Sequence, residues 1–262
     1  MSRVGSADLL GLPFALVTQS AAVATCLEWC RGPREPRVLM TANASHLCMM
    51  QHDAALRAAC DAADLVVADG MSVVWALRAA GIDVPERVAG VDLMVKLLEA
   101  GSGEGLRVYF LGAKNEVVTK LVRDCATKYP GLVVAGYRDG YFTPADHAAI
   151  AQEIRAAMPH LLFVGMPTPF KETWVEEYRA QLNVPVIIGV GGSFDVLAGV
   201  IQRAPRAVQR LGLEWAWRLM MEPRKLWKRY LTTNTEFIWR AGREVLQRRF
   251  GRPVIAGQRG QA

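Results

Sequence analysis

A run of four apolar residues that ends on a carboxylate and a glycine occupies Leu65–Met71, with the sequence LVVADGM. Such a run is typical of a buried parallel strand, and the helical pattern of Ser72–Ala80 follows it directly. The pattern places Asp69 at the carboxyl end of a strand, where ligands bind in open α/β sheets. Gly70 lets the backbone turn tightly and lets a ligand come close. Capping of the following helix by Asp69 is an equal alternative at this point.

Strands alternate with helical patterns on both sides of this stretch. We expect further strands at Arg37–Asn43, Arg107–Leu111, Leu132–Ala135, Leu161–Val164 and Val186–Val190. We expect helices from about Ala44 to Ala63 and at Leu93–Ala100, Asn115–Lys128, Pro144–Met158 and Lys171–Leu182. Little regular structure is expected in residues 1–13, and a flexible turn is expected at 101–105. The alternation predicts an α/β fold: a Rossmann-like, mostly parallel sheet with helices on both faces.

Small or polar residues follow several of these strands, so their loops should form one rim of the sheet with a single cleft. Gly112 lies between a strand and a helix, an order that resembles a phosphate-binding turn. Gly191 and Gly192 leave backbone amides free for an anion such as a diphosphate, and Ser193 and Asp195 open the next helix. A tight turn capped by Ser193 is the alternative. The full G-x-G-x-x-G pattern is missing, so nothing favours a dinucleotide cofactor.

Thr41 and Asn43 end the strand expected at 37–43. Their short polar side chains suit sugar hydroxyls. The same side chains can also cap the helix that begins near Ala44, and without further information we favour the cap.

Composition narrows the class of protein. The chain has 262 residues, of which 52% are hydrophobic, so it can bury a large core. No apolar run approaches the ~20 residues of a spanning helix, and the N-terminus lacks a secretory signal pattern, so we expect a cytoplasmic protein. Five cysteines lie scattered in apolar or helical segments, which predicts buried free thiols and no metal site.

Charge divides the chain into two parts. Residues 200–262 carry 14 Lys or Arg against 4 Asp or Glu, whereas residues 1–199 carry 17 against 21. From Ala204 onward the helical pattern is rich in arginine and holds four of the seven tryptophans. We therefore predict an α/β catalytic domain at 1–203 and a basic amphipathic helical appendage at 204–262.

The appendage has the profile of a helix that lies on an anionic membrane surface. Nucleic acid would also attract basic and aromatic residues, but the acidic body and the lack of a groove-reading motif argue against it. Packing of this helix in a homo-oligomer stays open, because tryptophans also anchor protein interfaces.

The chain resembles the WecG/TagA/CpsF family of bacterial glycosyltransferases, which is family twenty-six of the sugar transferases. The resemblance covers roughly residues 38–250. It is carried by Thr41-Ala42-Asn43, Ala68-Asp69-Gly70, Glu86–Asp92, Asp139–Phe142, Gly165–Glu172, Gly189–Asp195, Ala198-Gly199, Arg203–Pro205, Leu213–Trp215, Arg218-Leu219 and Glu222–Tyr230.

This resemblance implies an inverting, metal-independent transferase without a cofactor. It would move a sugar from a UDP-sugar to a polyprenyl-diphosphate-linked saccharide, in exopolysaccharide or cell-envelope polymer synthesis, at the inner face of the membrane. Asp69 matches the family's proposed general base, and Thr41 and Asn43 match residues that line the pocket. The appendage is implied to close over the site and to touch the membrane.

Further substrate contacts are expected within the matching segments. They are Gly70, Arg87, Asp92, Gly165, Glu172, Gly191, Gly192, Ser193 and Asp195; Gly112 is added to them because of the strand-glycine-helix order described above. An arginine of the appendage should stabilise the departing UDP in place of a metal ion, since the chain has no DxD motif. Arg224 is the first candidate, and Arg218 and Arg229 follow it.

One departure from the family concerns the donor sugar. Where the family usually reads Pro-Lys-Gln-Glu, this chain has Pro169-Phe170-Lys171-Glu172. A cation at Lys171 would meet a donor phosphate or a different sugar substituent, so UDP-glucose and UDP-N-acetylmannosamine are equal candidates. A UDP-sugar-binding scaffold without turnover is the competing hypothesis, and a Rossmann oxidoreductase is disfavoured by the missing glycine fingerprint.

Overall fold

The computed structural model describes residues 5–250, without the side chains of residues 225, 226, 228–230 and 250. The strands are β1 (Ser6–Leu9), β2 (Leu12–Ala15), β3 (Arg37–Ala42), β4 (Leu65–Ala68), β5 (Arg107–Gly112), β6 (Val133–Arg138), β7 (Leu161–Gly165) and β8 (Val186–Gly189). The helices are α1 (Gln19–Arg31), α2 (Ala44–Met49), α3 (Ala54–Asp61), α4 (Met71–Ala79), α5 (Gly90–Gly103), α6 (Asn115–Lys128), η1 (Pro144–Asp146), α7 (His147–Ala157), α8 (Phe170–Leu182), α9 (Ser193–Leu197), α10 (Arg206–Arg210), α11 (Glu214–Met221) and α12 (Pro223–Phe250).

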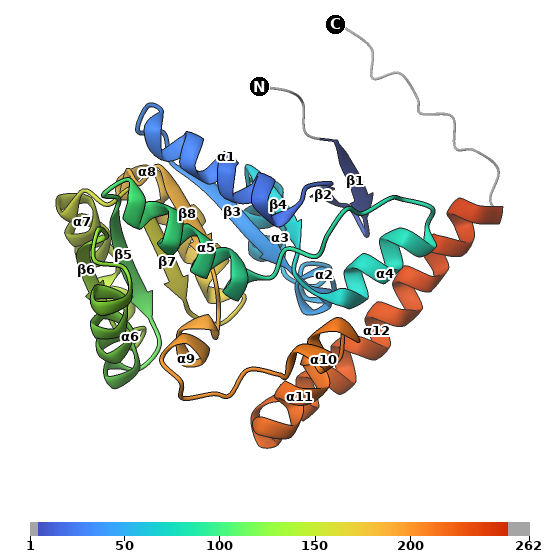
Figure 1. The fold of residues 1–262 in the computed structure, drawn as a ribbon. Helices are drawn as coiled ribbons and strands as arrows, with labels where there is room; N and C mark the ends of the chain where they lie inside the picture. Colours follow the sequence, from blue (N-terminus) through green and yellow to red (C-terminus); the bar gives the residue numbers. More distant parts are fainter. Residues whose placement is uncertain (1–4, 251–262) are drawn as a thin grey trace, which may run out of the picture.

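Six parallel strands form the central sheet in the order β4-β3-β8-β7-β5-β6, with helices on both faces (Figure 1). Most of the apolar runs predicted as strands are buried on both sides, as β4 shows with all four residues buried, whereas the residues of the edge strand β6 are exposed or half-buried. Leu39 packs with α1, α5 and α6 on one face, whereas its neighbour Val38 packs with α7 and α8 on the other. The predicted α/β fold with a mostly parallel sheet is confirmed.

The N-terminal segment differs from the prediction. Residues expected to lack regular structure form the antiparallel hairpin β1–β2, whose turn has positive φ at Leu10 (53°) and Gly11 (81°). Two positive φ angles define the turn that matches the twist of a two-residue hairpin. Leu9, Leu12 and Phe14 are fully buried against α2 and α4, and this packing stabilises two strands too short to be recognised from their pattern.

Three predicted boundaries also change. The helix expected at 44–63 is two helices, α2 and α3. Asp53 accepts a hydrogen bond from the Leu56 amide (3.0 Å) and so caps the N-terminus of the second helix, α3. The turn expected at 101–105 is mostly helical, since α5 continues to Gly103. The edge strand β6 continues through Gly136 to Arg138, past the end expected at Ala135.

The basic C-terminal segment packs against the body. α12 lies beside α2 and α4 (Figure 1), and Phe237 and Ala241 are buried in the core that these helices share with the hairpin. Polar contacts reach the hairpin: Glu244 accepts a hydrogen bond from the Leu10 amide (2.8 Å), and Arg248 donates to the Asp8 carbonyl (2.8 Å). Among the helices of residues 5–250, none is both long and apolar enough to cross a membrane.

Candidate functional site

A cleft of about 750 Å³ opens where the carboxyl ends of β3, β4 and β8 meet α4, α11 and α12. Its volume is typical of small-molecule sites. Its position is the one expected for an α/β sheet, because β4 and β5 follow each other in the chain but lie on opposite sides of β3, β8 and β7. Of the predicted site residues, the cleft is lined by Asn43, Asp69, Gly70, Arg87, Gly192, Ser193 and Arg218.

Asp69 follows the last residue of β4 and faces the cleft. Its Oδ1 accepts a hydrogen bond from the Gly90 amide (3.1 Å) at the start of α5, whereas α4 has Gly70 at its N-cap and receives no side-chain cap. The alternative that Asp69 caps the following helix is therefore wrong. Burial raises the pKa of Asp69 above its usual range, although the charge of Arg87 and the Gly90 hydrogen bond oppose this. A carboxylate with a raised pKa is a better proton acceptor near neutral pH.

Thr41 and Asn43, at the end of β3, make different contacts. Asn43 Oδ1 accepts a hydrogen bond from the Ser45 amide (3.0 Å), so the predicted cap of α2 is confirmed for a residue that also lines the cleft. The Thr41 hydroxyl is buried and donates to the Gly189 carbonyl (3.0 Å), which ties β3 to β8 outside the cleft.

A network of charges joins the body to α11. Arg87 pairs with Glu214, and Arg203 binds Asp92 through two hydrogen bonds of 2.7 and 2.6 Å. Arg203 Nε lies 3.6 Å from Glu214 Oε1, so both arginines share one carboxylate. Arg87 and Arg203 line the cleft, whereas Asp92 is paired with Arg203 and does not line it. Arg203 was missing from the predicted site, although it lies in a motif that carries the family resemblance.

The glycine loop after β8 meets an arginine of the appendage. A Cβ atom placed on Gly192 would lie 3.2 Å from Arg218 Cζ, so the missing side chain leaves room for the guanidinium. Ser193 does not cap its own helix: its hydroxyl donates to the Val190 carbonyl (2.7 Å). Arg218 therefore lies over a loop whose residues face the cleft, an arrangement that suits an anion.

Other predicted glycines have a packing role. A Cβ on Gly112 would lie 2.5 Å from the carbonyl carbon of Gly165, and a Cβ on Gly165 would lie 2.6 Å from the ring of Phe194. The close approach of β5, β7 and α9 thus requires both glycines. Neither lines the cleft, and Gly191 and Asp195 do not line it either.

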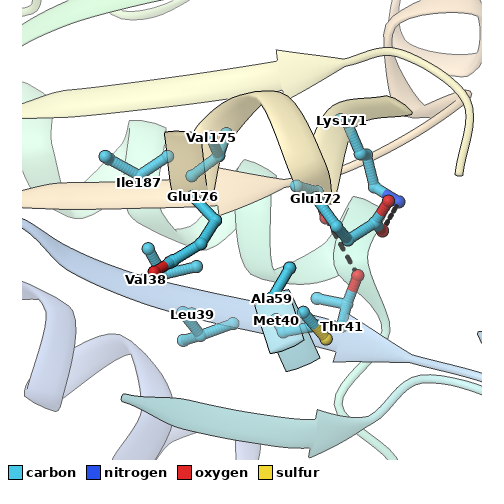
Figure 2. Close-up of a pocket in the computed structure, with 11 residues that line it drawn as sticks. Val38, Leu39, Met40, Thr41, Ala59, Lys171, Glu172, Val175, Glu176 and Ile187 are labelled. Atoms are coloured by element: carbon cyan, nitrogen blue, oxygen red, sulfur yellow. Dashed lines mark hydrogen bonds and ion pairs between the residues drawn. The ribbon is translucent and has the colours of Figure 1, made fainter. Parts of the chain in front are cut away.

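Lys171 and Glu172 lie behind the cleft, at the start of α8 (Figure 2). The two side chains are paired, and Lys171 Nζ lies 2.5 Å from Thr168 Oγ1 and 3.3 Å from His46 Nε2. Glu172 Oε1 lies 2.8 Å from His46 Nε2. Burial alone would raise the pKa of Glu172, but the hydrogen bond with His46 and the charge of Lys171 outweigh it and lower the pKa to about 2. Only His46 and Thr168 of this group reach the cleft, so Lys171 does not face it directly.

Arg224 lies in the first turn of α12, exposed to solvent, and does not line the cleft. The side chain of Arg229 lies outside the described residues. Both assignments stay predictions, whereas Arg218 is the predicted appendage arginine that the structure places in the cleft. No three His, Cys, Asp or Glu side chains in the described part of the chain come together as metal ligands would.

Comparison with known proteins identifies a family and two relatives. The model of the glycosyl transferase WecG/TagA/CpsF family matches residues 7–251. Two relatives, from Bacillus spizizenii and Bacillus subtilis, are both named N-acetylglucosaminyldiphosphoundecaprenol N-acetyl-beta-D-mannosaminyltransferase. They are 36% identical to this chain over 170 and 169 residues, which is 65% and 64% of this chain. The match spans 65% of the length of each relative, which is less than two thirds.

Proposed function

Because the chain belongs to the glycosyl transferase WecG/TagA/CpsF family, we propose that it transfers a sugar from a UDP-sugar to a polyprenyl-diphosphate-linked saccharide. The observation that carries the proposal is Asp69, a carboxylate with a raised pKa at the carboxyl end of β4, in a cleft also lined by Arg87, Arg203 and Arg218. The names of the relatives support a lipid-diphosphate acceptor, since they describe transfer to N-acetylglucosaminyldiphosphoundecaprenol.

Asp69 acts as the general base in this mechanism. Its carboxylate takes the proton of the acceptor hydroxyl while that oxygen attacks the anomeric carbon from the face opposite the UDP. The bond between the anomeric carbon and the UDP oxygen breaks, so the sugar is inverted and UDP leaves as an anion. A positioned base of this kind contributes ~10²- to 10⁴-fold to the rate.

Arginines stabilise the leaving diphosphate without a metal ion. Arg218 lies over Gly192, and Arg87 and Arg203 lie on the same cleft. Guanidinium groups bind phosphate oxygens through paired hydrogen bonds, and the stabilisation is greatest where water is excluded. Arg224 and Arg229 remain candidates, although Arg224 is exposed and does not line the cleft.

We place the protein at the inner face of the cell membrane, held by the appendage. Large apolar side chains are exposed on α11 and α12, namely Trp215, Met220, Met221, Trp227, Leu231, Ile238, Trp239 and Leu246. Exposed indoles beside arginines are typical of helices that bind anionic lipid surfaces. A second copy of the chain is the other predicted partner of this surface, and sedimentation without lipid distinguishes the two.

The function is tested by incubating the full chain with a set of UDP-sugars and a synthetic lipid-diphosphate saccharide. Release of UDP and the mass of the product identify the donor, with UDP-glucose and UDP-N-acetylmannosamine as the two expected candidates. Asp69→Asn should lose turnover and keep UDP-sugar binding, while Asp124→Asn, which changes an exposed carboxylate on α6, should retain turnover. Binding of UDP-sugars without transfer to any acceptor would contradict the proposal and support the scaffold hypothesis.

A further inference from the structure

The cleft has two ends of different chemistry. The polar end holds Asp69 and the arginines described above. The other end runs between α4 and α12, and we call it the apolar arm. It is lined by Trp75, Ala76 and Ala79 from α4 and by Ile238, Gly242 and Val245 from α12. One continuous cleft therefore joins a charged site to a hydrocarbon surface.

The apolar arm is an open groove with a closed floor. Phe237 and Ala241 of α12 are buried beneath it, packed into the core shared with α2 and α4. Its walls stay uncovered, since Trp75 is 47% exposed and Ile238 is 71% exposed. Large apolar side chains left exposed beside a ligand cleft mark a surface that an apolar partner covers.

Small residues keep the groove open. A Cβ atom on Gly242 would have no neighbour within 4 Å. Glycine is disfavoured in the interior of a helix because it loses more backbone entropy on folding than alanine does. Gly242 therefore makes α12 less stable than alanine would at the same position. One face of α12 lines the cleft along its length. Its cleft-lining positions recur at helical intervals, at 234, 237, 238, 241, 242 and 245.

We propose that the apolar arm binds the first isoprene units of the acceptor's polyprenyl chain. The diphosphate of the acceptor then lies between the apolar arm and the polar end of the cleft, and its saccharide hydroxyl lies toward Asp69. This inference rests on the proposed function, because it names where the acceptor of that reaction binds. It is carried by the matching order of chemistry: the ligand joins a charged head to a hydrocarbon chain, and the cleft joins an end lined by arginines and carboxylates to an apolar groove.

Substitution of Gly242 tests the apolar arm without touching the charged residues. Gly242→Phe fills the groove with a side chain that has open space to enter. Gly242→Ala is the matched control, because it makes the same backbone change and adds only a methyl group. Each variant is assayed in detergent micelles on two acceptors with the same diphosphate saccharide, one with a polyprenyl chain and one with a methyl group in its place.

Gly242→Phe should lower kcat/KM for the polyprenyl acceptor by about 10- to 100-fold, which corresponds to two or three lost methylene contacts. It should lower kcat/KM for the methyl acceptor far less than for the polyprenyl acceptor. On the polyprenyl acceptor, Gly242→Ala should lie closer to the wild type than to Gly242→Phe. Equal kinetics of Gly242→Phe and wild type on the polyprenyl acceptor would overturn the proposal. If that variant also lost binding to vesicles of anionic phospholipid, the groove would be a membrane-contacting surface instead.

A binding measurement separates this proposal from the proposed function. Geranylgeranyl diphosphate binding, followed by calorimetry, requires no turnover and should weaken about 10-fold or more in Gly242→Phe but not in Gly242→Ala. A wild-type chain that transfers to neither acceptor would contradict the proposed function, while the calorimetry still decides the occupant of the groove. Unchanged thermal unfolding of Gly242→Phe excludes loss of the fold as the cause.

Discussion

Replacing Lys171 by methionine should destabilise the protein through the charge it leaves behind. Lys171 and Glu172 are buried, with side-chain exposures of 6% and 3%. Methionine keeps the apolar stem of lysine and removes the ammonium group that pairs with Glu172. The carboxylate then keeps His46 and Thr168 as hydrogen-bonding partners but loses its cation.

The magnitude follows from the pKa of Glu172, which the surroundings lower from 4.5 to about 2. At about 1.4 kcal/mol per pKa unit, this difference favours the charged carboxylate by about 3 kcal/mol. Breaking a buried ion pair by removing one partner typically costs 3–5 kcal/mol. Because His46 supplies part of the stabilisation, we expect Lys171→Met to lower the free energy of unfolding by about 2–4 kcal/mol at pH 7.

The pH dependence has a definite sign. A carboxyl whose folded pKa is lowered stabilises the protein fully above its unfolded pKa of 4.5 and loses that effect as the pH falls toward 2. Without Lys171 the pKa of Glu172 rises, so Glu172 becomes protonated at a higher pH as the solution is acidified. The neutral carboxyl then costs less free energy to bury than the carboxylate does. The difference in stability between variant and wild type should therefore narrow between pH 7 and pH 3.

Urea unfolding followed by circular dichroism measures this difference at each pH. The control is Lys120→Met, which breaks an exposed pair with Asp124 and should change stability by less than about 0.5 kcal/mol. The double variant Lys171→Met/Glu172→Gln should recover part of the loss. Wild-type stability of Lys171→Met at pH 7 would refute the buried pair, and a changed donor KM with intact stability would favour the donor contact predicted from the sequence.

Asp69→Asn should keep the fold and lower kcat by ~10²- to 10⁴-fold. In the wild type, kcat/KM should fall on acidification through the raised pKa of Asp69, and a flat profile down to pH 4 would contradict its role as base. Arg218→Ala should raise the donor KM or cut turnover on a water-soluble acceptor more than Arg224→Ala does, and the reverse order would place Arg224 in the site. Added salt should release the protein from anionic vesicles before it harms turnover on the soluble acceptor, since surface attraction is screened within ~8 Å at physiological ionic strength; simultaneous loss of both would tie the appendage's charge to catalysis.

The sheet was predictable because its strands are short apolar runs that end on glycine or polar residues. Asp69 could be placed at a strand end for the same reason, and the structure brings it into the cleft. The hairpin could not be recognised, since its stability comes from packing against α2, α4 and α12, and the last of these is more than 200 residues away. Local pattern contains no information about such partners.

Glycine loops show a second limit of sequence reasoning. A glycine after a strand fits an anion-binding turn and a tight packing contact equally well. At Gly192 the neighbour is the Arg218 guanidinium, whereas at Gly165 the neighbour is the Phe194 ring. The environment of Lys171 was hidden in the same way, because His46 comes from α2, 125 residues away in the chain, and a lysine at a helix start is usually solvated.

The contacts between the hairpin and α12 also set an order of events during synthesis on the ribosome. The apolar side chains of Leu9, Leu12 and Phe14 emerge first, and part of what covers them is Phe237, which emerges near the end. Strands β3 to β8 lie between these segments in the chain, so they can pair before α12 has been synthesised. One wall of the cleft is formed by α12 and is therefore absent until synthesis is nearly complete, so the rim of strand ends forms before the cleft does.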